Sequence, residues 1–338
     1  MQKGPPRSLF KELIGLPTTL MTSSLPDLSV VVVNRNTADL LVTCLDHVFR
    51  SNLEKEPEVI VVDNGSSDDS VARVKKAFPS VLTLEAGKNL GFAAANNMAA
   101  KMVHSRFLLL VNTDALLEKD CARTLLDLMK SDARIGIAGP QLVNKDGSPQ
   151  TSFEAVPTLV TETFNRSLLK RVFPARFPGK RPNSQEPFSV EALIGAVMMV
   201  RREAFEELGG FDEDYFFFLE ETDLAVRMGQ AGLQVVHEPR ARAVHLQGAT
   251  ADVLPASARI EFYRSRYLFF SKHYGTRAMS ALKTVMTANL ALNVLGLGLV
   301  ALLTFGQARN ITNKLRVRSE LLKWHVQGCP EEQGLPRD

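Results

Sequence analysis

Short apolar runs recur along the first half of the chain. They are rich in Val, Leu and Ile, show no polar–apolar alternation, and lie at residues 28–33, 59–63, 81–84 and 106–112. A strand that is buried on both faces has this pattern, and such strands belong to parallel sheets. The pattern therefore predicts a parallel sheet whose first strand begins at Leu28.

Amphipathic stretches separate these runs. Between the first two, Leu41, Cys44, Leu45 and Val48 recur at helical spacing, which predicts a crossover helix. Similar patterns predict helices at about 92–102, 119–131 and 221–230, and a further strand that contains Gly195. Because strand and helix alternate four times in the first half, we expect an α/β fold with a doubly wound, mostly parallel sheet flanked by helices.

Changes in composition divide the chain into three parts. Residues 1–27 contain four prolines and no continuous apolar run of signal-peptide length, so we expect a flexible extension. Residues 28–275 are expected to form one α/β domain with halves at 28–144 and 145–275. The second half starts with a Pro-, Arg- and Phe-rich excursion that shows weak periodicity. Residues 276–338 are expected to form a helical tail.

Composition and charge exclude several classes of protein. The 338 residues are 45% apolar and 23% charged, and 40 basic against 37 acidic side chains leave a net charge of +3. These values argue against a disordered chain and against a nucleic-acid-coating protein, so no nucleic-acid partner is expected. The three cysteines lack metal-ligand spacing and are too few for a disulfide framework, which fits a reducing compartment.

Polar side chains follow three of the predicted strands. Asn34 ends the first, Asp63 and Asn64 end the second, and Asn112 and Asp114 follow the fourth. Ligands of open parallel sheets bind at these carboxyl ends. Three converging strand ends with two carboxylates, and no Ser-His-Asp order, favour a hydroxyl-rich, phosphorylated ligand over acyl transfer. No GxGxxG or GxxxxGK[ST] phosphate loop is present. If the ligand is a diphosphate, a metal must meet its charge, and Asn112 and Asp114 offer oxygen ligands for Mg²⁺ or Mn²⁺.

Five sequence blocks, in this order, resemble glycosyltransferase family 2, and most closely its rhamnosyltransferase-like branch. The resemblance covers about residues 28–275, and it implies a GT-A fold, an inverting reaction and a nucleoside-diphosphate sugar donor, with dTDP-rhamnose favoured and a UDP-sugar as an alternative. The blocks are Val32–Asn36, Val62–Ser66, Asn89–Asn96, Asn112–Asp114, and Gly209–Glu213 followed by Glu220–Leu224.

The same resemblance implies roles for individual residues. Asp63 would hold the base or ribose of the nucleotide. Asp114 matches the last position of the family's metal-binding Asp-x-Asp motif, whose first position is Asn112 here, and His245 matches the late histidine that completes metal or diphosphate binding. Glycosyl transfer would thus depend on Mg²⁺ or Mn²⁺. The residues implied in donor binding are Asn34, Asp63, Asn64, Gly91, Asn96 and Asn112.

The acceptor-side motif departs from the family's usual Glu-Asp. This chain has Glu220-Glu221, so the resemblance makes Glu221 the base that takes the proton from the acceptor hydroxyl as its oxygen attacks the anomeric carbon. Attack from the face opposite the leaving diphosphate inverts that centre. Glu220, Asp223 and Arg264 are candidate helpers for the acceptor or the diphosphate.

Each candidate also has a purely structural interpretation. Asp63 could cap the following helix, and Asp114 could form a turn. Acidic residues at 220–223 suit a helix N-terminus without any catalysis. His245 could be a structural histidine, and Arg264 could lie on a solvated helix face.

No charged residue lies between Lys283 and Arg309. Residues 284–308 would form a helix of about 37 Å, long enough to cross a bilayer. A single span would carry the five following basic residues away from the cytosol, against the positive-inside bias. A re-entrant or hairpin segment whose basic part returns to anionic headgroups fits better than a span or a buried helix. We expect residues 284–323 to contact the cytoplasmic face of the cell membrane, with peripheral or re-entrant anchoring.

Three functions are consistent with these patterns. The first is an inverting transferase that moves rhamnose or another hexose to a hydroxyl of a lipid-linked or cell-envelope glycan. The second is a catalytically weak sugar-nucleotide-binding scaffold, suggested by Asn112 and Glu221. A sugar-nucleotide-forming nucleotidyltransferase is disfavoured because its Gly-rich basic phosphate loop is absent.

Overall fold

The computed structural model of the protein describes residues 26–163, 184–246, 255–305 and 307–337. Most of the expected N-terminal extension, and residues 164–183 of the expected excursion, lie outside the described residues.

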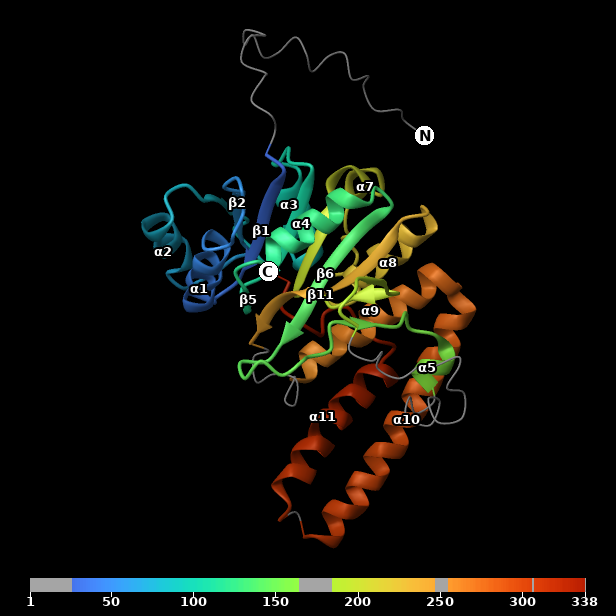
Figure 1. The fold of residues 1–338 in the computed structure, drawn as a ribbon. Helices are drawn as coiled ribbons and strands as arrows, with labels where there is room; N and C mark the ends of the chain where they lie inside the picture. The colour runs from blue at the N-terminus through green and yellow to red at the C-terminus, as the bar shows by residue number, and fades with distance from the viewer. Residues whose placement is uncertain (1–25, 164–183, 247–254, 306, 338) are drawn as a thin grey trace, which may run out of the picture.

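A nine-stranded mixed sheet occupies the centre of the molecule (Figure 1). Its strands are β1 (Leu28–Asn34), β2 (Glu58–Asp63), β3 (Leu82–Glu85), β4 (Phe107–Asn112), β5 (Ala115–Leu117), β6 (Ile135–Val143), β8 (Phe188–Ser189), β10 (Val197–Arg201) and β11 (Gln234–His245). Their order is β3-β2-β1-β4-β10-β6-β11-β5, with β8 beside β11. A separate two-stranded sheet pairs β7 (Phe153–Glu154) with β9 (Ala192–Leu193).

Strand direction confirms a mostly parallel sheet. β1 runs parallel to β2 and β4, and β6 runs parallel to β11, whereas β10 is antiparallel to both of its neighbours, β4 and β6. Helices cover the sheet. They are α1 (Ala38–Phe49), α2 (Ser70–Ala77), α3 (Phe92–Ala100), α4 (Cys121–Ser131), α5 (Leu159–Thr163), α7 (Arg202–Glu207) and α8 (Glu220–Gln230).

The first strand shows why the apolar runs do not alternate. Val30 and Val32 pack with α1 and α4 in one hydrophobic cluster, whereas Val31 packs with α3 and α8 in another. All three side chains are fully buried. β1 therefore separates two cores, and a polar residue on either face would lie in an apolar layer.

One local prediction was wrong. Gly195 lies between β9 and β10 and not inside a strand. A Cβ at this position would approach Glu221 Cδ to 3.4 Å, so the backbone here passes close to that side chain. The Gly195 backbone N–H bonds to Glu221.

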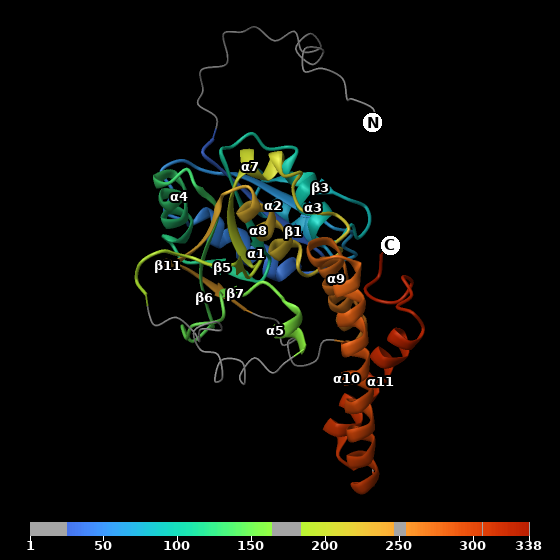
Figure 2. The same cartoon turned by 90° about the vertical axis from the view of Figure 1, so that its right-hand side faces the viewer.

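Three long helices complete the chain. α9 (Ala256–Tyr274) packs on the domain, and α10 (Thr276–Leu303) and α11 (Arg309–Val326) form a hairpin that extends away from it (Figures 1 and 2). The base of the hairpin has its own core, in which Trp324 and Leu282 pack against Phe269 and Phe270 of α9. Within the described residues, α10 is the one helix long and apolar enough to cross a membrane, and 11% of its most apolar window is buried.

Candidate active site

The carboxyl ends of β1 and β2 meet through a network around Asn34. This side chain is fully buried, and its Nδ2 donates to Asp63 Oδ1 at 3.3 Å and to Ser66 Oγ at 3.1 Å. Its Oδ1 accepts a 2.7 Å hydrogen bond from Thr37. Asp63 Oδ2 accepts from the Ser66 backbone N–H at 3.1 Å. The structure thus brings Asn34 and Asp63 together in a pre-organised polar cluster, as their positions at neighbouring strand ends predict.

Asn64 and Gly91 shape the loop before α3. Asn64 donates to the Gly91 carbonyl at 3.1 Å and accepts from the Leu90 N–H at 2.8 Å. Gly91 has φ +84°, and a Cβ on it would lie 2.4 Å from the Phe216 carbonyl oxygen, so only glycine fits. Asn96 donates to the Phe92 carbonyl within α3 at 2.9 Å. These three residues hold the loop through internal hydrogen bonds, and their contact with a donor stays a prediction.

The end of β4 meets the end of β11. The Asn112 backbone N–H bonds to the Ala196 carbonyl at 2.9 Å, and the Asp114 carbonyl accepts from the Leu246 N–H at 2.8 Å. These strand ends place His245 Nε2 3.6 Å from Asp114 Oδ2, although the two residues are distant in the sequence.

This pair can hold a divalent cation. Across the described residues, no group of three or more His, Cys, Asp and Glu side chains could hold a metal. A carboxylate and an imidazole do, however, suit Mn²⁺, and hard cations at phosphate sites take only one or two protein carboxylates, with water and substrate oxygens as the other ligands. The separation of 3.6 Å exceeds a hydrogen bond, and both side chains reach the surface. The donor set of Asp114 and His245 therefore fits a cation that also binds a diphosphate.

Glu220 and Glu221 start α8 after two residues in the left-handed region, Phe218 and Leu219, with φ of +76° and +67°. Burial raises the pKa of Glu221 to about 7, the charge of Glu154 adds to this, and bonds from backbone N–H groups, including that of Gly195, oppose it. A carboxyl group with this pKa is suited to general-base catalysis near neutral pH.

The pKa of Glu220 is raised further than that of Glu221. Burial, followed by the charge of Glu221, raises the pKa of Glu220 well above its usual range. Its Oε2 is buried and lacks a hydrogen-bond partner. Glu220 is thus the member of the pair more strongly held in the neutral form.

Glu221 is linked to the strand ends through two adjacent residues. Gly195 bonds to Glu221 through its backbone N–H, and Ala196 accepts the hydrogen bond from Asn112. The predicted base and the predicted donor residue Asn112 are therefore held by the same short segment.

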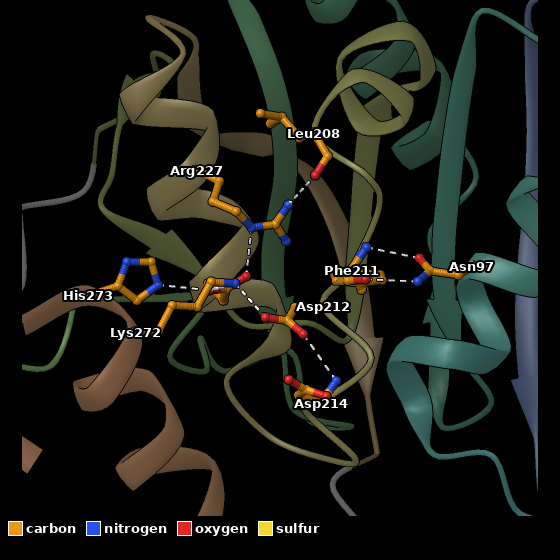
Figure 3. Close-up of polar contacts among 9 residues, drawn as sticks. Asn97, Leu208, Phe211, Asp212, Asp214, Arg227, Lys272 and His273 are labelled. Atoms are coloured by element: carbon orange, nitrogen blue, oxygen red, sulfur yellow. Dashed lines mark hydrogen bonds and ion pairs between the residues drawn. The ribbon is translucent and has the colours of Figure 1, made fainter. Parts of the chain in front are cut away.

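Asp223 lies in a buried ion cluster, of which Figure 3 labels Arg227, Lys272 and His273. Its carboxylate is fully buried and lies 2.7 Å from Arg227 Nε, 2.8 Å from Lys272 Nζ and 2.7 Å from His273 Nε2. Lys272 also pairs with Asp212 at 2.5 Å. Both carboxylate oxygens of Asp223 are engaged within the protein, and they tie α8 to the end of α9. Its role as a helper for the acceptor or the diphosphate stays a prediction.

Hydrogen bonds from two helices, α3 and α8, hold the turn between α7 and α8 (Figure 3). Asn97 of α3 donates to the Phe211 carbonyl at 2.8 Å and accepts from the Phe211 N–H at 2.9 Å. On the other side, Arg227 donates to the Leu208 carbonyl at 3.0 Å. The Gly-Gly-Phe-Asp-Glu block thus positions the start of α8.

Arg264, a candidate diphosphate helper, contacts the C-terminal segment. Its guanidinium pairs with Glu261 and donates to the Pro330 carbonyl at 3.3 Å. Farther along this segment, Arg337 lies 4.7 Å over the Phe216 ring, and the Pro336 carbonyl accepts a 3.0 Å hydrogen bond from Asn89. Sequence reasoning missed these contacts, since a short polar terminus carries no periodic signal.

The sequence analysis also did not identify Gln150 as a site residue. Its side chain contacts His245 at both the ring and the backbone, with distances of 3.2 and 2.7 Å. It lies in the Pro-rich excursion, where no pattern pointed to a site.

The sequence model described as glycosyl transferase family 2 matches residues 29–209, more than half of the chain. The chain belongs to glycosyl transferase family 2. A second model, described as the N-terminal domain of galactosyltransferase, matches residues 176–247 of this family 2 protein.

Curated relatives narrow the type of enzyme. The N-acetylglucosaminyl-diphospho-decaprenol L-rhamnosyltransferase of Mycobacterium tuberculosis is 29% identical over 255 residues, which are 71% of this chain and 82% of that protein. The rhamnosyltransferase WbbL of Escherichia coli is 21% identical over 64% of this chain and 82% of its own length. The protein is therefore a rhamnosyltransferase-like glycosyltransferase of family 2.

Solved structures confirm the expected GT-A fold. A mannosyltransferase from Pyrobaculum calidifontis in complex with GDP-Man and Mn²⁺ superposes with a TM-score of 0.55 at 18% identity, over 92% of this chain and 88% of that one. GalNAc-T7 with UDP, GalNAc and Mn²⁺ gives a TM-score of 0.52 at 18% identity, over 66% of this chain and 44% of that one.

Proposed function

We propose that this glycosyltransferase moves rhamnose or another hexose, with dTDP-rhamnose as the favoured donor and a UDP-sugar as the alternative, to a hydroxyl of a lipid-linked or cell-envelope glycan. The observation that carries the proposal is two polar contacts at the carboxyl ends of the strands, Asn34 with Asp63 and Asp114 with His245. A 3.1 Å hydrogen bond from Thr37 to Thr113 joins them, and Gly195 and Ala196 tie Glu221 to Asn112. The named rhamnosyltransferase relatives support the donor and acceptor classes.

In this mechanism Asp63 and Asn34 bind the nucleoside, and Asp114 and His245 hold a Mg²⁺ or Mn²⁺ ion. The bound ion supplies electrostatic stabilisation of the negative charge on the departing diphosphate. Glu221 accepts the proton of the acceptor hydroxyl, whose oxygen attacks the anomeric carbon from the opposite face. One carboxylate is enough for this inverting displacement, and such base catalysis contributes about 10² to 10⁴-fold.

The α10–α11 hairpin supports a lipid-linked acceptor. Leu295, Leu299, Leu302 and Leu303 of α10 expose more than half of their surface, and α11 carries basic residues such as Arg316. The hairpin extends from the end of the molecule toward which the carboxyl ends of β6 and β11 point (Figure 1). Through residues 284–323 the protein would bind the cytoplasmic face of the cell membrane by peripheral or re-entrant anchoring, because α10 lies beside α11 as a hairpin.

The test combines donor binding with transfer. Thermal shift is measured with dTDP-, UDP- and GDP-sugars, with and without Mn²⁺, because a ligand that binds the folded state raises its apparent stability. Transfer to a polyprenol-linked glycan is then compared for wild type, Glu221→Gln and Asp114→Ala. Asp127→Ala, on an exposed face of α4, is the matched control.

We expect selective stabilisation by a dTDP-sugar with Mn²⁺, and loss of transfer in both site variants but not in the control. Near-normal transfer in Glu221→Gln and Asp114→Ala would refute the assigned roles. Donor binding by wild type without turnover on any acceptor would instead favour the scaffold function suggested by Asn112 and Glu221.

A further inference from the structure

The side chain of Gln150 contacts His245 at two points. Its Nε2 lies 2.7 Å from the His245 carbonyl oxygen, and its Oε1 lies 3.2 Å from His245 Nδ1. The same Nε2 lies 2.7 Å from Asn144 Oδ1. One amide group therefore spans the backbone and the ring of the histidine that faces Asp114.

The hydrogen-bond partners fix the direction of each contact. A backbone carbonyl oxygen can only accept, so the Gln150 atom facing it is the NH₂ group. The second hydrogen of that group goes to Asn144 Oδ1, whose own Nδ2 donates to Ser148 Oγ at 2.8 Å. The remaining amide atom, Oε1, is an acceptor, and it requires a proton on His245 Nδ1.

A neutral imidazole with its proton on Nδ1 has a lone pair on Nε2. In this structure Nε2 faces Asp114 Oδ2 at 3.6 Å. Two electron-pair donors thus face each other at a distance that a hydrogen bond does not bridge, which is the arrangement that a divalent cation between them requires.

We propose that Gln150 is a positioning residue that holds His245 in the tautomer presenting the Nε2 lone pair to the cation shared with Asp114. This role rests on the metal site of the proposed function. It deepens that site by adding an outer-shell residue, of the kind that orients metal-binding histidines in other proteins.

The backbone of Gln150 is fixed well enough for this role. Its N–H donates to the Leu142 carbonyl at 2.8 Å, which anchors it to β6. Its carbonyl accepts from Gln141 Nε2 at 2.9 Å, and the same Gln141 nitrogen lies 2.9 Å from Ser152 Oγ. Gln141 therefore steadies the same segment without contacting His245, so Gln141→Ala is a matched control.

The experiment measures Mn²⁺ binding by titration calorimetry with saturating dTDP, and in parallel with UDP. The variants are Gln150→Ala and Gln150→Met, the second of which keeps the volume of the side chain. We expect both to weaken Mn²⁺ binding about 10- to 100-fold, the usual effect of removing an outer-shell partner, and Gln141→Ala to change it by less than about threefold.

A double-mutant cycle separates positioning from a general loosening of the segment. If Gln150 acts through His245, Gln150→Ala causes no further loss of Mn²⁺ affinity once His245→Ala is present. An equal loss in both backgrounds would overturn the proposal. Nitrogen NMR of the metal-free protein provides a second readout: a protonated Nδ1 and an unprotonated Nε2 in wild-type His245 are expected, and the opposite tautomer would overturn the role of Gln150.

The outcomes also separate this role from the proposed function. A wild-type protein that binds no Mn²⁺ with either nucleotide would refute the metal site itself and this role with it. A wild-type protein that binds Mn²⁺, together with Gln150 variants that bind it equally well, would refute only the role of Gln150.

Discussion

The titration of Glu221 determines both the pH dependence of transfer and part of the protein's stability. Burial raises the pKa of this carboxyl to about 7, and only the ionised form can accept a proton from the acceptor. With this pKa the ionised share is about one tenth at pH 6 and about nine tenths at pH 8. We therefore expect kcat to rise about tenfold between pH 6 and pH 8, with a midpoint near 7.

Glu221→Gln removes the base and also the buried charge. Transfer should fall by about 10² to 10⁴-fold, the range for loss of a general base. Stability should change in the opposite direction. The pKa of Glu221 is higher in the folded protein than in the unfolded chain, so folding favours the neutral carboxyl. The protein is therefore most stable below the unfolded pKa, and it loses this stability as the pH rises through the folded pKa.

The size of this stability change follows from the shift. A rise from 4.5 to about 7 corresponds to at most about 3–4 kcal/mol at about 1.4 kcal/mol per pKa unit, and partial solvent contact of Glu221 reduces it to about 1–3 kcal/mol. Glu221→Gln should be more stable than wild type by this amount at pH 8, and the difference should shrink toward zero near pH 4.5.

Two assays test these expectations. Initial rates are measured from pH 5.5 to pH 9 at saturating donor and acceptor, and urea unfolding is measured at pH 8 and pH 4.5. Glu203→Gln, an exposed acidic residue in the first turn of α7, is the matched control for loss of a helix-start charge. A flat pH profile, or a Glu221→Gln enzyme with transfer within threefold of wild type, would refute the assignment of the base.

Three further predictions follow from the structure. Asp223→Asn removes the buried negative charge beside Arg227 and Lys272 and should lower the free energy of unfolding by about 3–5 kcal/mol in urea titrations; a loss below about 1 kcal/mol would contradict the ion cluster. Gly91→Ala forces a Cβ against the Phe216 carbonyl in a left-handed backbone and should cost more than about 1 kcal/mol, with weaker donor binding by thermal shift; unchanged stability would refute the close approach. Replacing the exposed Lys314 and Arg316 by Ala should weaken binding to anionic vesicles by roughly 30-fold, at about 1 kcal/mol per basic residue, without affecting neutral vesicles. Equal binding in a co-sedimentation assay would rule out these basic residues of α11 as a membrane contact.

The sequence patterns that are local in the chain predicted the fold well. The strand at Leu28 needs apolar residues on both faces because it separates two cores, and this requirement is visible in the four consecutive valines at 30–33. The cluster of Asn34 and Asp63 was predictable for a related reason, since parallel strands bring their carboxyl ends to one edge.

Contacts between distant segments were not predictable in the same way. Asp223 lies in the first turn of α8, where the helix dipole already explains an acid, so nothing in the sequence pointed to Lys272 and His273. Gln150 is an ordinary polar residue until its loop folds back on β6 and meets His245. The sequence predicted Gly195 inside a strand because its contact with Glu221 of α8 leaves no local signal.

The buried ion cluster links the proposed membrane contact to the proposed base. Asp223 lies two residues after Glu221 on α8, and its partners Lys272 and His273 lie in the last turn of α9. Gly275 alone separates α9 from α10, whose exposed leucines are the surface proposed to meet lipid. A hairpin fixed in the membrane would therefore fix the height of α8 above it, because the α9 helix and the contacts of Lys272 and His273 with Asp223 leave little freedom between them. For an acceptor carried on a lipid, whose reactive hydroxyl also lies at a set height, this linkage would bring base and hydroxyl to the same level.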